Sequence, residues 1–308
     1  MSTVDVHSVA VPVRSGAVLA VGNFDGVHLG HRRMIEQLVA LARELGTLAW
    51  AVTFDPPPLA LLAPGRMPPQ LTTLPQKIER LKSIGVDEVI VCPTTRELLA
   101  LSAEQFFEGI LLQQLGCRGM VEGPNFRFGR GRGGDIALLQ KLCAEHQLPL
   151  VIVEACELEG NMVSSSEVRS ALLTGNVAQA RRLLGRPYSI SGVVAQGAQR
   201  GRQLGFPTAN LDQIETLLPP EGVYAGQATV DGVRYPVALN IGPNPTFEEH
   251  RLKVEAHLVG FSGDLYGRVV TVEFLEHLRG VVKFPGIEAL RTQLQHDIAE
   301  AKRIASVE

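Results

Sequence analysis

The chain has 308 residues, of which 45% are apolar and 20% are charged, and its formal net charge is −3. This length predicts two domains of about 150 residues each, and so small a net charge excludes a broad basic surface for nucleic acid. No apolar run approaches the roughly 18 residues that a membrane helix needs, and residues 1–14 lack the pattern of a signal peptide. We therefore expect a cytoplasmic globular protein without nucleic-acid or membrane partners.

Strand and helix patterns alternate through the first half of the chain. The apolar run Ala17–Val21 predicts a buried strand, and apolar residues at helical spacing from Met34 to Leu45 predict a helix. Further strands are predicted at 48–53, 88–92, 118–121 and 149–153, further helices at 75–84, 103–115 and 136–146, and a stiff loop at the prolines 56–58. This alternation predicts an α/β fold with a parallel sheet, whose ligands bind beyond the carboxyl ends of the strands.

The strongest functional signal is residues 22–31, Gly-Asn-Phe-Asp-Gly-Val-His-Leu-Gly-His, between that first strand and its helix. A glycine-broken turn from strand to helix directs backbone N–H groups and a helix N-terminus toward a bound anion. His28 and His31 can donate hydrogen bonds to phosphate oxygens and neutralise charge on a transferring phosphoryl group. Two surface histidines near a helix cap are the alternative. The flanking glycines, with Asn23 and Asp25 in the turn, favour a phosphate-bearing ligand.

Two other segments of the first half carry candidate binding groups. In residues 122–135, aromatic rings offer a stacking surface and arginines can pair with phosphate, although a solvated mobile loop is the alternative. Ser164, Ser165 and Arg169 bring two hydroxyls and a guanidinium to one predicted helix start, which suits an anionic ligand. A capping box of Ser164 with Glu167 explains the serine equally well but leaves Arg169 unexplained.

The second half changes character after Arg186, where we place the boundary between domains 1–186 and 187–308. Strands predicted at 224–230 and 233–240 flank Asp231 and Gly232, which are typical of a type I′ hairpin. Residues 253–259 and 268–275 alternate with the period of a strand. Helical spacing returns only from Ile287 onward. We therefore predict a small antiparallel barrel over residues 187–278, closed by a C-terminal helix.

Candidate chemistry in this half lies in two places. Thr208 and Asn210, two residues apart on an extended segment, point the same way and offer oxygen ligands that suit Mg²⁺. An ordinary Pro-Thr turn is the alternative. Glu255 shares a strand face with Lys253 and His257. It is either a solvent-facing residue or the base that takes a hydroxyl proton during phosphoryl transfer.

Residues 16 to 301 resemble the prokaryotic family of bifunctional riboflavin kinases and FMN adenylyltransferases, also called FAD synthetases. Residues 22–31 are similar to the family's nucleotidyltransferase turn with its H-x-G-H. Further motifs that carry the resemblance lie, in the same order, at 125–129, 164–169, 205–210, 222–224, 244–247, 254–257 and 264–267. Three positions depart from the family pattern. Pro57 stands where the family often has a histidine, Ser166 replaces the usual threonine and keeps its hydroxyl, and Val281 stands where the family often has an acid.

The resemblance implies a Rossmann-like nucleotidyltransferase domain followed by a kinase barrel, acting on small molecules. The barrel would transfer the γ-phosphoryl group of ATP to the 5′-hydroxyl of riboflavin, with Thr208 and Asn210 holding Mg²⁺ and Glu255 as the base. The first domain would then join AMP to FMN, whose phosphate attacks the α-phosphorus of ATP and releases pyrophosphate. The product would be FAD. An enzyme that keeps only one activity and a non-catalytic flavin-binding protein are the alternatives.

The resemblance also implies roles for individual residues. His28 and His31 would brace the phosphates of ATP and the developing charge, and Asn125 would help to place the flavin. Ser164, Ser165 and Arg169 would bind the phosphates from the other side. The remaining residues implied in binding are Gly22, Asn23, Phe24, Asp25, Gly30, Gly205, Pro207 and Arg279. The sequence leaves the oligomeric state open, a homo-oligomer included.

Overall fold

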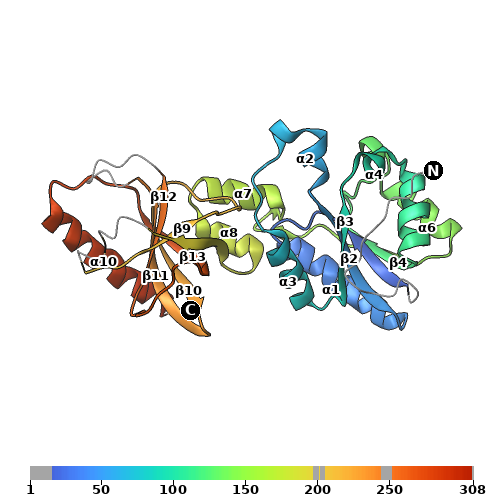
Figure 1. The fold of residues 1–308 in the computed structure, drawn as a ribbon. Coiled ribbons are helices and arrows are strands. Elements are labelled where there is room, and N and C mark those ends of the chain that lie inside the picture. The colour runs from blue at the N-terminus through green and yellow to red at the C-terminus, as the bar shows by residue number, and fades with distance from the viewer. Residues whose placement is uncertain (1–15, 197–200, 202–204, 244–251, 307–308) are drawn as a thin grey trace. The chain divides into compact units, whose positions relative to one another are not determined.

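The computed structural model describes residues 16–196, 201, 205–243 and 252–306 (Figure 1). The chain divides into two compact units, Met1–Ser164 and Ser165–Glu308. The helices within residues 165–186 are therefore grouped with the second unit, whereas the sequence places a functional boundary after Arg186. That functional boundary stays a prediction.

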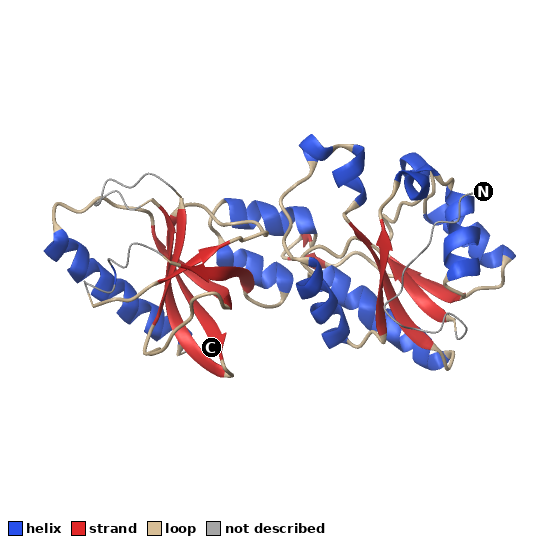
Figure 2. Cartoon of the chain, in the orientation of Figure 1, coloured by secondary structure: helices blue, strands red, loops and turns tan. Residues whose placement is uncertain are grey.

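The first unit is built on a five-stranded parallel sheet (Figure 2). Its strands are β1 (Ala17–Val21), β2 (Leu48–Asp55), β3 (Glu88–Pro93), β4 (Cys117–Glu122) and β5 (Leu150–Ile152), in the order β3-β2-β1-β4-β5. The chain moves outward from β1 to β3 and then places β4 on the other side of β1. The strand order therefore reverses between β1 and β4, which is where open α/β sheets bind ligands. The predicted parallel sheet is confirmed.

Helices cover both faces of this sheet. They are α1 (Leu29–Glu44), α2 (Pro58–Leu62), α3 (Leu74–Ile84), α4 (Arg96–Ala100), α5 (Ala103–Gln105), the π-helix η2 (Phe106–Gln114) and α6 (Ile136–Glu145), with the 3₁₀ turns η1 (Pro64–Arg66) and η3 (Arg130–Arg132). Alternate β1 side chains enter different cores. Leu19 packs with α5, η2 and α6, whereas Val18 packs with α1 and α3. A hairpin of β6 (Glu157–Leu158) and β7 (Asn161–Met162) follows β5.

Two local predictions differ from the structure. The prolines 56–58 were expected to exclude regular structure, but Pro58 begins α2. Proline is favoured in the first turn of a helix because its missing N–H would have no partner there. The predicted helix 103–115 is present and Ser102 caps it, but most of it has the wider turn of a π-helix. Its buried residues are Phe106, Phe107, Ile110 and Leu111.

The second unit is a closed antiparallel barrel with helices packed against it. Its strands are β8 (Tyr188–Ala195), β9 (Ala209–Asp212), β10 (Gly222–Val230), β11 (Val233–Gly242), β12 (Lys253–Leu258) and β13 (Val269–Arg279), and they pair in the order β10-β11-β12-β9-β8-β13. Helices α7 (Ser165–Leu173) and α8 (Val177–Leu184) precede the barrel, and α10 (Ile287–Ala305) follows it. Asp231 and Gly232 have φ of 52° and 80°, as a type I′ hairpin requires. The predicted barrel and C-terminal helix are confirmed.

Candidate functional site

The turn at residues 22–31 leaves the sheet at the carboxyl end of β1. The backbone N–H of Gly22 still donates to the carbonyl of Val52 in β2 at 2.9 Å, and the chain then bends away. Phe24 and Val27 have left-handed φ of 48° and 44°, which is strained for residues with a Cβ and costs about 1–3 kcal/mol each. Both side chains are buried, so packing holds the strained turn in place.

His28 and His31 lie together at the start of α1. Their rings stack with centroids 3.7 Å apart, and Nδ1 of His28 accepts from the backbone N–H of His31 at 3.3 Å. Because Nδ1 is the acceptor, the ring proton of neutral His28 lies on Nε2. A Cβ at Gly30 would lie 3.1 Å from the His28 ring, so a larger residue there would crowd the stack. The two histidines therefore form one feature, rather than two independent surface side chains.

The carboxylate of Asp25 is held by the protein itself. It accepts from the backbone N–H groups of Leu71 and Thr72 and from the Thr72 hydroxyl, at 3.0 to 3.1 Å. The same hydroxyl oxygen accepts from the backbone N–H of Gly26 at 3.2 Å. The sequence predicts Asp25 as a binding residue, and the structure shows it anchoring the segment that leads into α3.

Lys77 of α3 is a residue near this turn that the sequence analysis missed. Its side chain is only 3% exposed, and Nζ donates to Oγ1 of Thr53 at 3.4 Å. Thr53 in turn donates to the carbonyl of Asn23 at 3.3 Å. Burial lowers the pKa of Lys77, and the carboxylates of Asp25 and Asp55 oppose that shift. The available signal was a lysine four residues before Leu81, on the face of the helix that is buried.

Glu122, at the end of β4, is the second missed residue. Its Oε1 accepts from the backbone N–H of Val21 at 2.7 Å, across the point where the strand order reverses. The paired register of β1 and β4 ends at Leu19 and Met120, so the carboxyl group replaces a carbonyl that β4 no longer supplies. Burial raises the pKa of Glu122 well above its ordinary value. This side chain fixes the residue from which the turn departs.

We expect Glu122→Gln to remove a pH dependence of stability. The pKa of Glu122 is raised in the folded state, so the folded protein keeps a proton that the unfolded chain loses above about pH 4.5. As the pH rises from about 4.5 to the folded-state pKa, the free energy of unfolding of the wild type should therefore fall, relative to the variant, by about 1.4 kcal/mol per pH unit. Urea unfolding followed at Trp50, the single tryptophan, measures this in the first unit. A stability difference that does not vary with pH would contradict a protonated Glu122.

Backbone contacts hold part of residues 122–135, while residues 124, 125, 127 and 130–133 are exposed. Phe128 and Gly134 exchange backbone hydrogen bonds at 3.1 and 2.9 Å, and the Phe126 ring stacks on Phe128 with centroids 5.3 Å apart. Gly129, at φ 71°, approaches α5 so closely that a Cβ would lie 2.5 Å from the backbone nitrogen of Ala103. Asn125 is exposed at this segment, and its amide nitrogen lies 3.9 Å from the sulfur of Met162.

The predicted group Ser164, Ser165 and Arg169 spans the division between the units. The carbonyl of Val163 lies 3.5 Å from where a Cβ of Gly30 would be, so the chain passes the turn at residues 22–31 just before Ser164. Ser165 begins α7, with Arg169 on the same helix, and both belong to the second unit. Their contribution to a site with His28 stays a prediction.

In the barrel, the strand register brings Glu255 and Asn210 together. Glu255 of β12 is paired with Asn210 of β9 on one side and with Asn240 of β11 on the other. Directly opposed residues of antiparallel strands share a face, so these three side chains form a row across three strands. Val254 and Ala256 point into the barrel and are buried, whereas Glu255 is half-buried on the outer face. Sequence reasoning did not identify Asn240.

The two predicted metal ligands line different pockets of the second unit. One, of about 350 Å³, is lined by Thr208 together with Pro207 and residues 261–266. The other, of about 470 Å³, is lined by Asn210 together with Lys253. Both volumes are in the range of small-molecule sites. The exposed Gly205, at φ 88°, precedes this segment, while the motif at 244–247 lies outside the described residues.

The donors of this site fit Mg²⁺. Thr208 and Asn210 offer a hydroxyl and an amide oxygen, and Mg²⁺ binds through few protein oxygens while keeping water and phosphate ligands. Among the residues that the structure describes, no group of three or more His, Cys, Asp or Glu side chains could hold a metal.

In the described part of the chain, no helix combines the length and apolar character that crossing a membrane requires.

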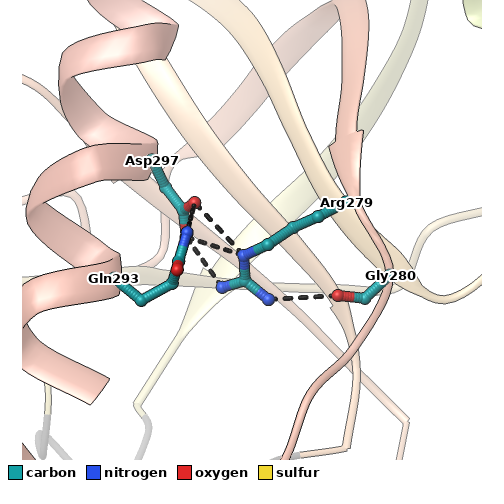
Figure 3. A network of polar contacts seen from close by, with 4 residues as sticks. All are labelled: Arg279, Gly280, Gln293 and Asp297. Carbon is teal, nitrogen blue, oxygen red and sulfur yellow. Dashed lines mark hydrogen bonds and ion pairs between the residues drawn. The ribbon is translucent and has the colours of Figure 1, made fainter. Parts of the chain in front are cut away.

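Arg279, a predicted binding residue, is engaged by α10 (Figure 3). Its Nη2 and Nε donate to the carboxylate of Asp297 at 2.7 and 3.2 Å, and Nη1 donates to the carbonyl of Gly280 at 3.0 Å. Gln293 donates to the same carboxylate at 2.8 Å. Asp297 is 2% exposed, so this pair attaches α10 to the end of β13. The carboxylate partner of Arg279 thus comes from α10.

Comparisons with known proteins match both halves of the chain. The family model described as FAD synthetase matches residues 11–167, and the model described as riboflavin kinase matches residues 184–305. Proteins named bifunctional riboflavin kinase/FMN adenylyltransferase from Escherichia coli (strain K12) and Pseudomonas fluorescens are 36% and 38% identical to it, each over 96% of this chain and 95% of the relative.

The fold is also similar to a solved structure. A crystal structure of a protein described as a macrolide-efflux protein from Streptococcus pneumoniae has 28% sequence identity and a TM-score of 0.84, covering 97% of this chain and 96% of that chain. With the two family models and the relatives covering nearly its whole length, the chain belongs to the family of bifunctional riboflavin kinases and FMN adenylyltransferases.

Proposed function

We propose that residues 187–308 phosphorylate riboflavin to FMN and that residues 1–186 adenylylate FMN to FAD. This assignment of one reaction to each half is supported by two separate sets of candidate residues for phosphate binding and transfer. The stacked pair His28 and His31 lies on the first unit, and the row that contains Glu255 and Asn210 lies on the barrel. ATP is the co-substrate of both reactions.

In the kinase reaction, Glu255 accepts the proton of the 5′-hydroxyl of riboflavin as that oxygen attacks the γ-phosphorus of ATP. The bond from the γ-phosphorus to the bridging oxygen breaks, and ADP leaves. Glu255 is half-buried and is paired across the strands with Asn210, one of the two proposed metal ligands. Mg²⁺ held by Thr208 and Asn210 would offset the charge of the phosphates. Thr208 and Asn210 each line a pocket, of about 350 and 470 Å³ respectively.

In the adenylylation reaction, an oxygen of the FMN phosphate attacks the α-phosphorus of ATP, and pyrophosphate leaves. The substrate supplies the nucleophile, so the protein contributes position and charge stabilisation. His28 and His31, whose rings stack at the start of α1, brace the phosphates of ATP and the developing charge. Gly22, Asn23, Phe24 and Gly30 shape the turn, while Asn125 contacts the flavin. Ser164, Ser165 and Arg169 bind phosphate.

A time course of flavin products tests the proposed function. Purified protein is incubated with riboflavin, ATP and MgCl₂, and the flavins are separated by chromatography. FMN should appear first and FAD should follow at its expense, because each reaction supplies the substrate of the next. FMN that accumulates without FAD would contradict the bifunctional assignment and favour an enzyme with one activity.

We expect His28→Ala to lower FAD formation from supplied FMN by about 10²-fold, the loss typical of removing one hydrogen-bond donor to a charged transition state. FMN formation from riboflavin should stay at the wild-type rate, since the kinase residues lie on the other unit. His146→Ala, at an exposed histidine of the first unit, is the matched control. Equal loss of both activities in His28→Ala would contradict two separate sites.

A further inference from the structure

Lys77 is a buried charge that the reaction as described does not use. Its side chain is 3% exposed on α3, a helix that packs against the core of the first unit. An isolated ammonium in such a place is strongly destabilising, and an apolar side chain of the same length would fill the space without that penalty. A lysine at this position therefore needs a reason beyond packing.

The surroundings of Lys77 connect it to the turn at residues 22–31 in two ways. The first is a hydrogen-bonded relay from Nζ through Oγ1 of Thr53, which is fully buried, to the carbonyl of Asn23. The second is electrostatic, since the carboxylates of Asp25, within the turn, and Asp55, at the end of β2, both interact with the ammonium. Asp25 also receives the N–H groups of Leu71 and Thr72, which begin the approach to α3.

These contacts reduce electrostatic repulsion between the protein and a bound phosphate. Two carboxylates beside a turn that receives a triphosphate would repel it, because like charges interact strongly where solvent is partly excluded. The buried ammonium of Lys77, which interacts with both carboxylates, reduces that repulsion. It also fixes the carbonyl of Asn23, so that the strained backbone of residues 22–27 keeps one conformation.

We propose that Lys77 is a positioning residue for ATP in the adenylylation site: it holds the turn through Thr53 and offsets the charge of Asp25 and Asp55. This inference rests on the proposed function of residues 22–31. It assigns a role in binding one substrate, ATP, and none in the kinase reaction.

Lys77→Met tests the proposal because it keeps the length of the side chain and removes its charge. With FMN and ATP supplied, we expect the KM for ATP in FAD formation to rise about tenfold or more, while the KM for FMN stays within about twofold. Riboflavin phosphorylation by the same molecules should be unchanged. In Lys77→Met/Asp55→Asn, one repelling carboxylate is also gone, and the KM for ATP should return part of the way to the wild-type value.

Two further variants keep the test decisive if Lys77→Met disturbs folding. Lys77→Arg retains the charge and should keep the KM for ATP within about threefold of the wild type. Thr53→Val preserves shape but cuts the relay, and should raise the KM for ATP without changing riboflavin phosphorylation. Trp50 fluorescence reports whether the first unit is folded in each variant, since Trp50 lies in β2, the strand that also carries Thr53.

The outcomes separate this inference from the proposed function. If Lys77→Met and Thr53→Val keep the wild-type KM for ATP while His28→Ala lowers FAD formation, the role of Lys77 is wrong and the function stands. If activity falls only in proportion to the unfolded fraction, and Asp55→Asn restores nothing, Lys77 is merely structural and the inference is overturned. If His28→Ala also leaves FAD formation unchanged, the proposed site itself is wrong.

Discussion

Glu255→Gln is expected to reduce FMN formation from riboflavin by about 10²- to 10⁴-fold, the range that positioned acid–base catalysis supplies. Glutamine keeps the size and hydrogen-bonding oxygen of the side chain but cannot accept the hydroxyl proton. FAD formation from supplied FMN should be unaffected, because none of the residues proposed for that reaction lies in the barrel strand that carries Glu255. Chromatography of flavins after incubation with riboflavin, or separately with FMN, measures both rates on one preparation.

The matched control for this variant is Glu276→Gln. Glu276 is an exposed carboxylate on β13 of the same barrel, outside the row formed by Asn240, Glu255 and Asn210. Its replacement should leave both activities unchanged. Wild-type FMN formation by Glu255→Gln would show that another group, or water, takes the proton.

Asp297→Ala is expected to destabilise the second unit by about 3 kcal/mol, since removing one partner of a buried ion pair leaves the other charge uncompensated. Asp297 is 2% exposed and receives Arg279 and Gln293. Urea unfolding can assign the loss to a unit. The single tryptophan, Trp50, lies in the first unit, whereas the four tyrosines, at 188, 224, 235 and 266, lie in the second. The transition seen at Trp50 should not move.

A double variant tells an unpaired charge from a lost contact. Arg279→Met/Asp297→Leu replaces the pair by apolar groups and should recover most of the stability lost in Asp297→Ala. It also examines the binding role that the sequence predicts for Arg279. If the double variant is folded and its KM for ATP and riboflavin equals that of the wild type, Arg279 serves to attach α10 and not to bind substrate. An Asp297→Ala variant as stable as the wild type would contradict the structural role.

Local sequence patterns were sufficient for the architecture. The alternation of apolar runs and helical spacing in residues 17–153 predicts a parallel sheet, because each pattern depends only on neighbours in sequence. Asp231 and Gly232 predict their own hairpin for the same reason. Residues 22–31 likewise form a local unit, in which His28 and His31 are three residues apart on the first turn of α1. The strands β8 and β9 were not predicted individually, since neither has a clear turn signal at both ends.

The contacts that complete the sites depend on tertiary structure. Glu122 bonds to a residue 101 positions away, Lys77 reaches Thr53, and Arg279 meets Asp297 from another element. Glu255 lies beside Asn210 only because the closed barrel sets the register between β12 and β9. Such pairings follow from sheet order and strand register, which are fixed by the packing of the whole unit. The sequence by itself determined the fold class and the residues whose side chains are capable of binding or catalysis. Tertiary packing decided which of those residues meet and which charges are buried.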